Sequence, residues 1–193
     1  FIIPTIPKQT KLSYDSYFPK HGIIVAIPDH WIREHQKTDK NYNSITFGDK
    51  TVCNLTIETK FNDQPVELDG MEEQFFNSLN TNSSSNHILV KSREREQIIV
   101  AGYSAIYLKL NILSWTELIS HVVLLARGNY SYIIIYNVPK WLNSAEQTLL
   151  TNFLSSIIVV TPDRLAEARR NHTLIPSDKN KHLLLRELDY AKE

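Results

Sequence analysis

The stretch YSYIIIYNV at residues 130–138 decides the fold class. Its β-branched and aromatic residues are the types that fit a pleated sheet surface, and a Gly-Asn turn at residues 128–129 precedes it. Two more apolar stretches lie just upstream, at residues 98–113 and 115–127. Three consecutive strands joined by short turns predict an antiparallel meander.

Shorter strands are predicted upstream of the meander. Residues 22–27 form a β-rich run that ends at a Pro-Asp turn. Residues 44–47 and 51–58 flank a Gly-Asp-Lys turn, and alternating apolar and polar residues in the second run predict a hairpin with one buried face. Residues 87–91 follow as a short strand, and the alternating charges at 93–96 predict a solvated turn.

Two amphipathic helices complete the predicted domain. Asp69 and Glu72 form a capping-box pattern that predicts a helix over residues 70–80, and the Asn/Ser/Thr tract at 80–86 predicts a mobile surface loop after it. A second capping box begins at Ser144 and predicts a terminal helix laid on the sheet. The apolar stripes of the two helices are Met71, Phe75, Phe76 and Leu79, and Leu149, Leu150, Phe153, Leu154 and Ile157.

The chain divides into three predicted parts. Residues 1–20 are rich in proline and polar spacers, which predicts an extended N-terminal arm rather than a packed element. Residues 21–160 form the domain, an α+β fold in which helices pack on an antiparallel β-sheet. Residues 161–193 form a C-terminal helical tail, with a helix at 162–171 after a Thr-Pro start. We expect the arm and the tail to contact other protein subunits.

The composition argues against several function classes. The 193 residues carry 21 Lys and Arg against 21 Asp and Glu, and this balance disfavours a nucleic-acid partner. No apolar run reaches the roughly 20 residues that span a bilayer, so the sequence predicts no transmembrane segment. The single cysteine excludes an internal disulfide and a thiolate metal cluster.

The start of the sequence bears on cellular location. The first residue is Phe1 and the only methionine is Met71. We therefore expect the initiator to lie upstream, with a signal peptide, a lipid anchor or another segment removed. The removal of such a segment predicts that the protein is exported. The sequence leaves open whether the segment also attaches the protein to a membrane.

No motif in the sequence predicts catalysis, a cofactor site or a metal site. His30 and His35 are five residues apart, which does not place both rings on one helical face. His121 lies within an apolar strand and is predicted to be a hydrogen-bonded core or interface imidazole rather than a base. Cys53 has the inward phase of its strand, and Ser104 lacks the glycines and the following helix of a nucleophile elbow. We expect a protein that is not an enzyme.

Four stretches resemble the DcrB/PsbP/Mog group of α/β sandwiches. They are IVAIPDHW at residues 24–31, VAGYSAIYL at 100–108, and the closing strand and helix at 129–136 and 144–158. The resemblance covers about residues 21–160 and implies the sandwich fold of that group. It also implies scaffold roles for the matching positions, with Trp31 in the core.

The resemblance implies a role without catalysis, because members of the group are typically exported lipoproteins, an extrinsic photosystem subunit, a GTPase partner or chaperones for secreted effectors. We expect an exported assembly subunit, an accessory structural component of a bacterial cell-envelope complex such as a secretion system. The expected place is the periplasm or the periplasmic face of the outer membrane, and a cytoplasmic place stays open. The alternatives are a periplasmic module that binds a small ligand or lipid under the 70–80 helix, and a hydrolase.

Aromatic and tail residues are the candidate partner contacts. Trp141 follows Pro139 and is predicted to be exposed enough to anchor a partner. Trp141 belongs to an aromatic set for which two interpretations stay open, the lining of a pocket or interface and, for most of its members, packing on the sheet face. The other members are Trp115, Tyr130, Tyr132 and Tyr136. The candidate contact residues are Trp141, Trp31, Arg164, Arg169, Leu184 and Leu188.

Overall fold

The computed structural model describes residues 12–18, 23–28, 30–49, 53–86 and 88–159. Residues 1–11 of the predicted arm lie outside these ranges, as does the whole predicted tail from residue 161, including its helix at 162–171.

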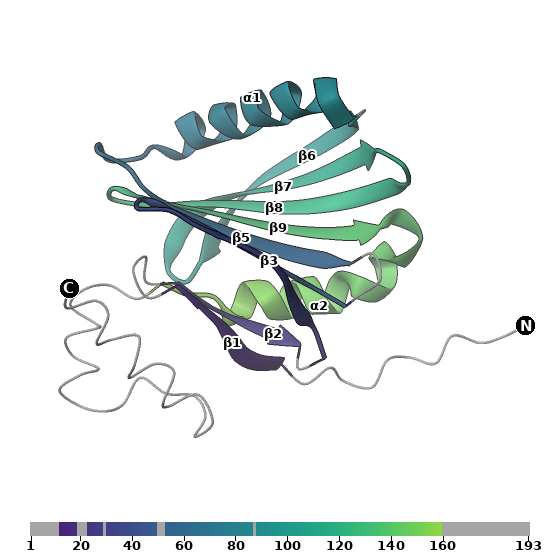
Figure 1. The fold of residues 1–193 in the computed structure, drawn as a ribbon, viewed down its shortest axis with the longest axis horizontal. Coiled ribbons are helices and arrows are strands. Elements are labelled where there is room, and N and C mark those ends of the chain that lie inside the picture. Colours follow the sequence, from purple (N-terminus) through teal and green to yellow (C-terminus); the bar gives the residue numbers. More distant parts are fainter. Residues whose placement is uncertain (1–11, 19–22, 29, 50–52, 87, 160–193) are drawn as a thin grey trace, which may run out of the picture.

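The described residues form a seven-stranded antiparallel sheet in the order β3-β4-β5-β9-β8-β7-β6 (Figure 1). Its larger half is a meander of β6 (Leu89–Val100), β7 (Tyr103–Leu113), β8 (Glu117–Arg127) and β9 (Tyr130–Pro139). The predicted meander is confirmed. The predicted turn at 93–96 is wrong, because these residues lie within β6 and the chain reverses at Ala101 and Gly102 instead. The single strand predicted over 98–113 is wrong for the same reason, because this reversal divides it between β6 and β7.

The other half of the sheet contains β3 (Ile32–Thr38), β4 (Tyr42–Gly48) and β5 (Asn54–Phe61). β4 and β5 pair from Tyr42–Lys60 to Gly48–Asn54, so the predicted hairpin is confirmed. β3 was not predicted. All of its side chains are exposed, because it is an edge strand with no covered face, and it therefore lacks the apolar alternation that reveals a strand.

A smaller sheet packs below the large one in the order β1-β2-β10. Its strands are β1 (Leu12–Phe18), β2 (Ile23–Pro28) and β10 (Ile158–Val159). The strand predicted at 22–27 is β2. The prediction that residues 1–20 contain no packed element is wrong for residues 12–18, which pair antiparallel with β2 along its length.

Helix α1 (Leu68–Asn86) covers one face of the large sheet, and α2 (Asn143–Ser156) lies on the opposite side with the small sheet (Figure 1). A short 3-10 helix, η1 (Lys140–Leu142), leads into α2. The backbone of α1 stays helical through Asn86, so the predicted loop at 80–86 is wrong. The start predicted at Ser144 is also wrong, because α2 begins at Asn143 without a side-chain cap. Neither of these helices is long and apolar enough to cross a membrane.

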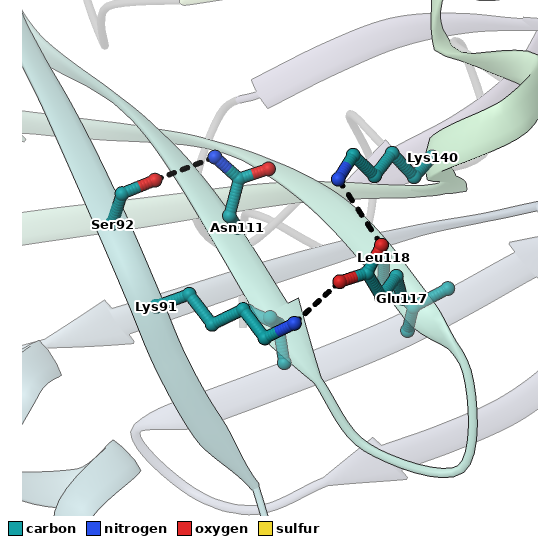
Figure 2. A pocket seen from close by; sticks show the side chains of 7 residues that line it. Lys91, Ser92, Asn111, Glu117, Leu118 and Lys140 are labelled. Carbon is teal, nitrogen blue, oxygen red and sulfur yellow. Dashed lines mark hydrogen bonds and ion pairs between the residues drawn. The ribbon is translucent and has the colours of Figure 1, made fainter.

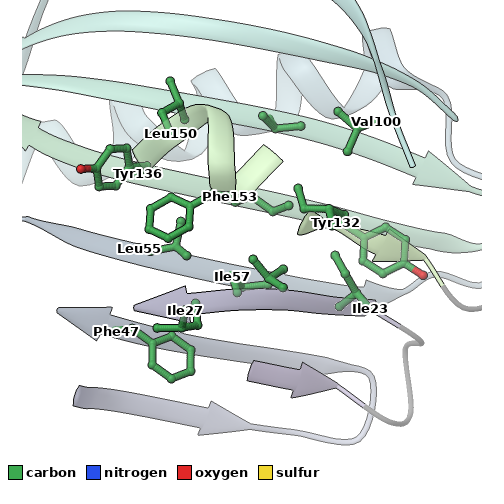
Figure 3. Close-up of a cluster of buried hydrophobic side chains, with 14 of the residues drawn as sticks. Ile23, Ile27, Phe47, Leu55, Ile57, Val100, Tyr132, Tyr136, Leu150 and Phe153 are labelled. Atoms are coloured by element: carbon green, nitrogen blue, oxygen red, sulfur yellow. The ribbon is translucent and has the colours of Figure 1, made fainter. Parts of the chain in front are cut away.

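Each face of the sheet has its own core. On the α2 side, apolar residues of the sheet, β2 and α2 pack together, and Figure 3 shows Phe153 of α2 beside Tyr136 and Leu55. On the α1 side, Met71 and Phe75 pack on apolar residues of β7 and β8. The α+β class, with helices packed on an antiparallel sheet, is thereby confirmed.

Candidate functional site

Exposed apolar side chains mark the candidate site. Among the described residues, five large hydrophobic side chains are exposed, and the two tryptophans lead: Trp115 is 92% exposed and Trp141 is 78% exposed. The other three are Ile32, Leu89 and Ile99. Single exposed aliphatic residues are ordinary on protein surfaces, but indoles rank among the side chains most enriched at binding interfaces.

The two tryptophans lie at the same end of the large sheet. Trp115 belongs to the turn between β7 and β8, which a hydrogen bond from Ser114 N to Thr116 O closes at 3.1 Å. Trp141 lies in η1, directly after β9. β8 is paired with β7 on one side and with β9 on the other, so the turn and η1 are neighbours at the right-hand end of the sheet in Figure 1. The chain brings them together through the meander.

Charged residues flank these indoles. The Glu117 carboxylate, at the start of β8, forms ion pairs with Lys91 of β6 and, at 3.1 Å, with Lys140 of η1 (Figure 2). Two hydrogen bonds lower the pKa of Glu117: the one from Lys91 has the larger effect, and the one from Lys140 the next largest. Part of a hollow of about 220 Å³ is lined by these three side chains. We call the surface formed by Leu89, Lys91, Trp115, Glu117, Lys140 and Trp141 the tryptophan end.

A buried hydrogen-bond network supports the tryptophan end from inside. His121 is 2% exposed, and its Nδ1 atom lies 2.7 Å from the Tyr107 hydroxyl. Its Nε2 atom lies 2.9 Å from Oδ1 of Asn143, which can only accept a hydrogen bond. Nε2 therefore donates to Asn143, and Nδ1 accepts from Tyr107.

The network favours uncharged side chains. Burial lowers the pKa of His121, so the ring is neutral, and burial raises the pKa of Tyr107 to about 12. Both ring nitrogens of His121 are already bonded to protein atoms. The imidazole thus ties β8 to β7 and to the first residue of α2, as the predicted core histidine does.

The candidate nucleophiles of the sequence, Cys53 and Ser104, also lie where they support the fold. Cys53 is 4% exposed and belongs to the core on the α2 side. Ser104 is the second residue of β7, far from the strand-to-helix turn that a nucleophile elbow needs. Within the described ranges, no group of three or more His, Cys, Asp or Glu side chains could hold a metal ion.

The space under α1 is mostly filled. Met71 and Phe75 pack directly on the sheet, and beside them a hollow of about 180 Å³ remains, lined in part by Tyr42 and Glu58. Burial raises the pKa of both Tyr42 and Glu58. Pockets for drug-sized ligands occupy about 300 Å³ or more and are mostly apolar. The packing under α1 therefore disfavours the alternative of a module for a small ligand or lipid.

The candidate contact residues fall into three groups. Trp141 is exposed, as predicted. Trp31 is 8% exposed and packs against Tyr136 and Phe153, so a core role replaces the contact role considered for it. The four tail candidates, Arg164, Arg169, Leu184 and Leu188, lie outside the described residues.

Trp115 was not predicted as a site residue. It was a member of the aromatic set, and the sheet-face packing expected for most of that set does not hold for Trp115, because it lies in a turn and its side chain is exposed. The signal was its flanking pair of Ser114 and Thr116, which separates two apolar strands and favours a turn.

Comparisons with known proteins identify the fold of this chain but do not assign it to a family. No protein-family model matches the sequence, and no curated protein matches it.

Solved structures do show similarity. The solution structure of PsbP (CyanoP) from Synechocystis sp. PCC 6803 has 14% sequence identity and a TM-score of 0.57, and the match covers 81% of this chain and 96% of that one. A crystal structure from Bacteroides thetaiotaomicron VPI-5482 has 12% identity and a TM-score of 0.49, over 96% of this chain and 71% of that one. The Ran-binding protein Mog1p of Saccharomyces cerevisiae has 13% identity and a TM-score of 0.45, over 74% and 93%. Through CyanoP, the resemblance to the DcrB/PsbP/Mog group is confirmed at the level of the fold.

Proposed function

We propose that this protein is an accessory subunit without catalytic activity, which docks on a protein partner through the tryptophan end. The observation that carries the proposal is the exposure of Trp115 and Trp141 on neighbouring loops of one sheet end. Each Trp side chain can bury about 150–250 Å² of surface on contact, and tryptophan is among the residues that dominate binding energy.

The surroundings of the two indoles fit a docking surface. Leu89 extends the apolar area onto β6, and the ion pairs of Glu117 with Lys91 and Lys140 provide a polar rim. The backbones of both loops are anchored to a broad antiparallel sheet, and the bond between His121 and Asn143 fixes the chain just after Trp141. Such anchoring reduces the conformational entropy lost on binding.

The finer part of the proposal concerns location and further contacts. On the basis of the family resemblance, we propose an exported component of a bacterial cell-envelope complex, such as a secretion system. We also propose that the arm and the tail contact neighbouring subunits, the tail through Arg164, Arg169, Leu184 and Leu188. Fractionation of source cells tests the location: recovery with periplasmic or outer-membrane proteins supports it, and recovery only with cytoplasmic proteins contradicts it.

Quantitative co-purification tests the docking surface. The variant carrying Trp115→Ala and Trp141→Ala is compared with wild type in extracts of the source cells. Ile32→Ala is the matched control, because it removes an exposed large apolar side chain at the β3 edge of the same sheet. The proposal requires a partner that the double variant loses and the control keeps. A partner retained equally by both variants would contradict it.

A further inference from the structure

The edge strand β6 has the properties of a site that accepts an additional strand. Within the described residues, β6 is paired only with β7, so one row of its backbone N–H and C=O groups faces outward along 12 residues. Nine of these residues lie between Leu89 and Ile99, which are 57% and 71% exposed. A long edge strand of this kind is a template for strand addition, and proteins commonly protect such edges with charge.

The charges on β6 are separated by face. Arg93 lies over the ring of Phe76, and Arg95 forms ion pairs with Glu72 and Asp69, so both arginines lie on the α1 face. Glu94 forms an ion pair with Lys109, and Glu94 and Glu96 line a hollow of about 340 Å³ together with residues of α2. The two glutamates therefore lie on the α2 face.

Among the described residues, one charge on each face has no oppositely charged partner. Glu94 and Arg95 are compensated by the ion pairs just described. Arg93 and Glu96 form no ion pair with any residue that the structure describes. A strand added at this edge would set one of its side chains beside each of these two charges, at positions three residues apart and on opposite faces.

We propose that β6 accepts an antiparallel strand from a different polypeptide, with a basic residue opposite Glu96 and an acidic residue opposite Arg93. Read from its N-terminus, that strand carries the basic residue first and the acidic residue three positions later. Apolar residues flank this pair, because the ends of β6 present Leu89 and Ile99. Backbone hydrogen bonds supply attraction, and the two charge pairs select the register.

A second copy of this chain is a poor occupant of the edge. Two β6 strands paired antiparallel around a twofold axis keep the α1 faces of both copies on the same side, so residues directly opposite each other share a face. Every register that sets two of residues 93–96 opposite each other then pairs Arg with Arg or Glu with Glu. Like charges directly opposite destabilise a strand pair.

The test uses two short peptides of the same composition, acetylated and amidated at their ends. The peptide VTTKVTEV sets Lys opposite Glu96 and Glu opposite Arg93 when it lies along residues 92–99, and VTTEVTKV exchanges the two charges. At low salt we expect the first peptide to bind about fivefold more tightly and to protect β6 amides from hydrogen exchange. The variant carrying Arg93→Glu and Glu96→Arg should reverse this preference.

Three results would overturn the proposal: equal affinity for the two peptides, no reversal in the exchanged variant, or protection outside β6. Thermal unfolding of the exchanged variant first verifies that it is folded. Analytical ultracentrifugation of the wild type adds the test of a second copy, because a concentration-dependent dimer that protects β6 amides would also contradict the proposal. None of these measurements depends on Trp115 or Trp141, so they are independent of the proposed function.

Discussion

The imidazole of His121 and the side-chain amide of Asn143 are joined by a hydrogen bond of 2.9 Å between Nε2 and Oδ1. This bond links the middle of β8 to the first residue of α2, and Tyr107 of β7 completes the network on the other ring nitrogen. In the neutral ring that burial favours, Nε2 donates to Asn143 and Nδ1 accepts from the Tyr107 hydroxyl. Protonation of the ring therefore opposes its burial between β7, β8 and α2.

The stability of the protein should therefore fall on acidification through His121. Burial lowers the pKa of the folded protein's His121 below its ordinary value of 6.5, whereas the unfolded chain keeps that value. Below this pH the unfolded state binds the proton more readily, so the free energy of unfolding decreases until the lowered pKa is passed. Urea unfolding between pH 7.5 and about pH 5 measures the slope.

His121→Gln should remove this part of the pH dependence, since glutamine has no proton to bind in that range. His35→Gln is the matched control, because His35 lies on the exposed strand β3 and its loss should leave the slope unchanged. An identical slope in wild type and His121→Gln would contradict the expected role of the buried ring.

The three tryptophans should differ sharply in their effect on stability. Trp31 packs against Tyr136 and Phe153, so Trp31→Ala should lower the free energy of unfolding by about 3–5 kcal/mol. Trp115→Ala and Trp141→Ala remove exposed side chains and should change it by no more than about 0.5 kcal/mol each. Urea unfolding of the three variants measures both effects, and a large loss in either exposed variant would show that its indole supports the fold.

Thr59 offers a stabilising substitution. Its Oγ1 atom is buried and has no hydrogen-bond partner among the described residues. Thr59→Val keeps the shape and removes this unsatisfied hydroxyl, so it should raise the free energy of unfolding by about 1 kcal/mol. Thr56→Val is the contrasting control: its Oγ1 lies 2.9 Å from Oγ1 of Thr46, so the same change should lower stability. Equal effects of the two substitutions would count against the unsatisfied hydroxyl as the cause.

The turn between β6 and β7 contains a second destabilised position. Ala101 has a φ of 53° and Gly102 a φ of 85°, and an alanine in the left-handed region costs roughly 1 kcal/mol. Ala101→Asn should raise the thermal midpoint, because Asn-Gly is a preferred pair for such two-residue turns. Gly102→Ala should lower the midpoint through backbone strain alone, since nothing lies within 4 Å of the added Cβ. A lower midpoint for Ala101→Asn would contradict this reading of the turn.

Much of the fold could be predicted because buried positions require apolar residues, and these produce a recognisable pattern in the sequence. The β4–β5 hairpin and the apolar stripe of α2 recur at the period of their element. In the meander, β8 is buried on both faces, and its continuous apolar run predicts a strand instead. The elements that were missed lack this pattern. β3 is exposed on all sides, and the last residues of α1 are Asn and Ser, which carry no apolar stripe although the backbone is helical.

The candidate site was predicted only in part, for a different reason. The position of Trp141 after a proline indicated exposure, but the nearness of Trp115 depends on strand order and register. The partners of Glu117 also come from β6 and η1, which are 26 and 23 residues away in the sequence. Such a surface is assembled by the sheet and leaves no local motif.

Site-specific photo-crosslinking in source cells tests the docking claim most directly. A photoreactive phenylalanine is placed at Trp115 or Trp141, and at Ile32 as the exposed control on the β3 edge of the sheet. We predict that both tryptophan positions crosslink to the same partner protein and that Ile32 does not. The opposite result would contradict docking through the tryptophan end: a partner that crosslinks only from Ile32, or no crosslink from either tryptophan position.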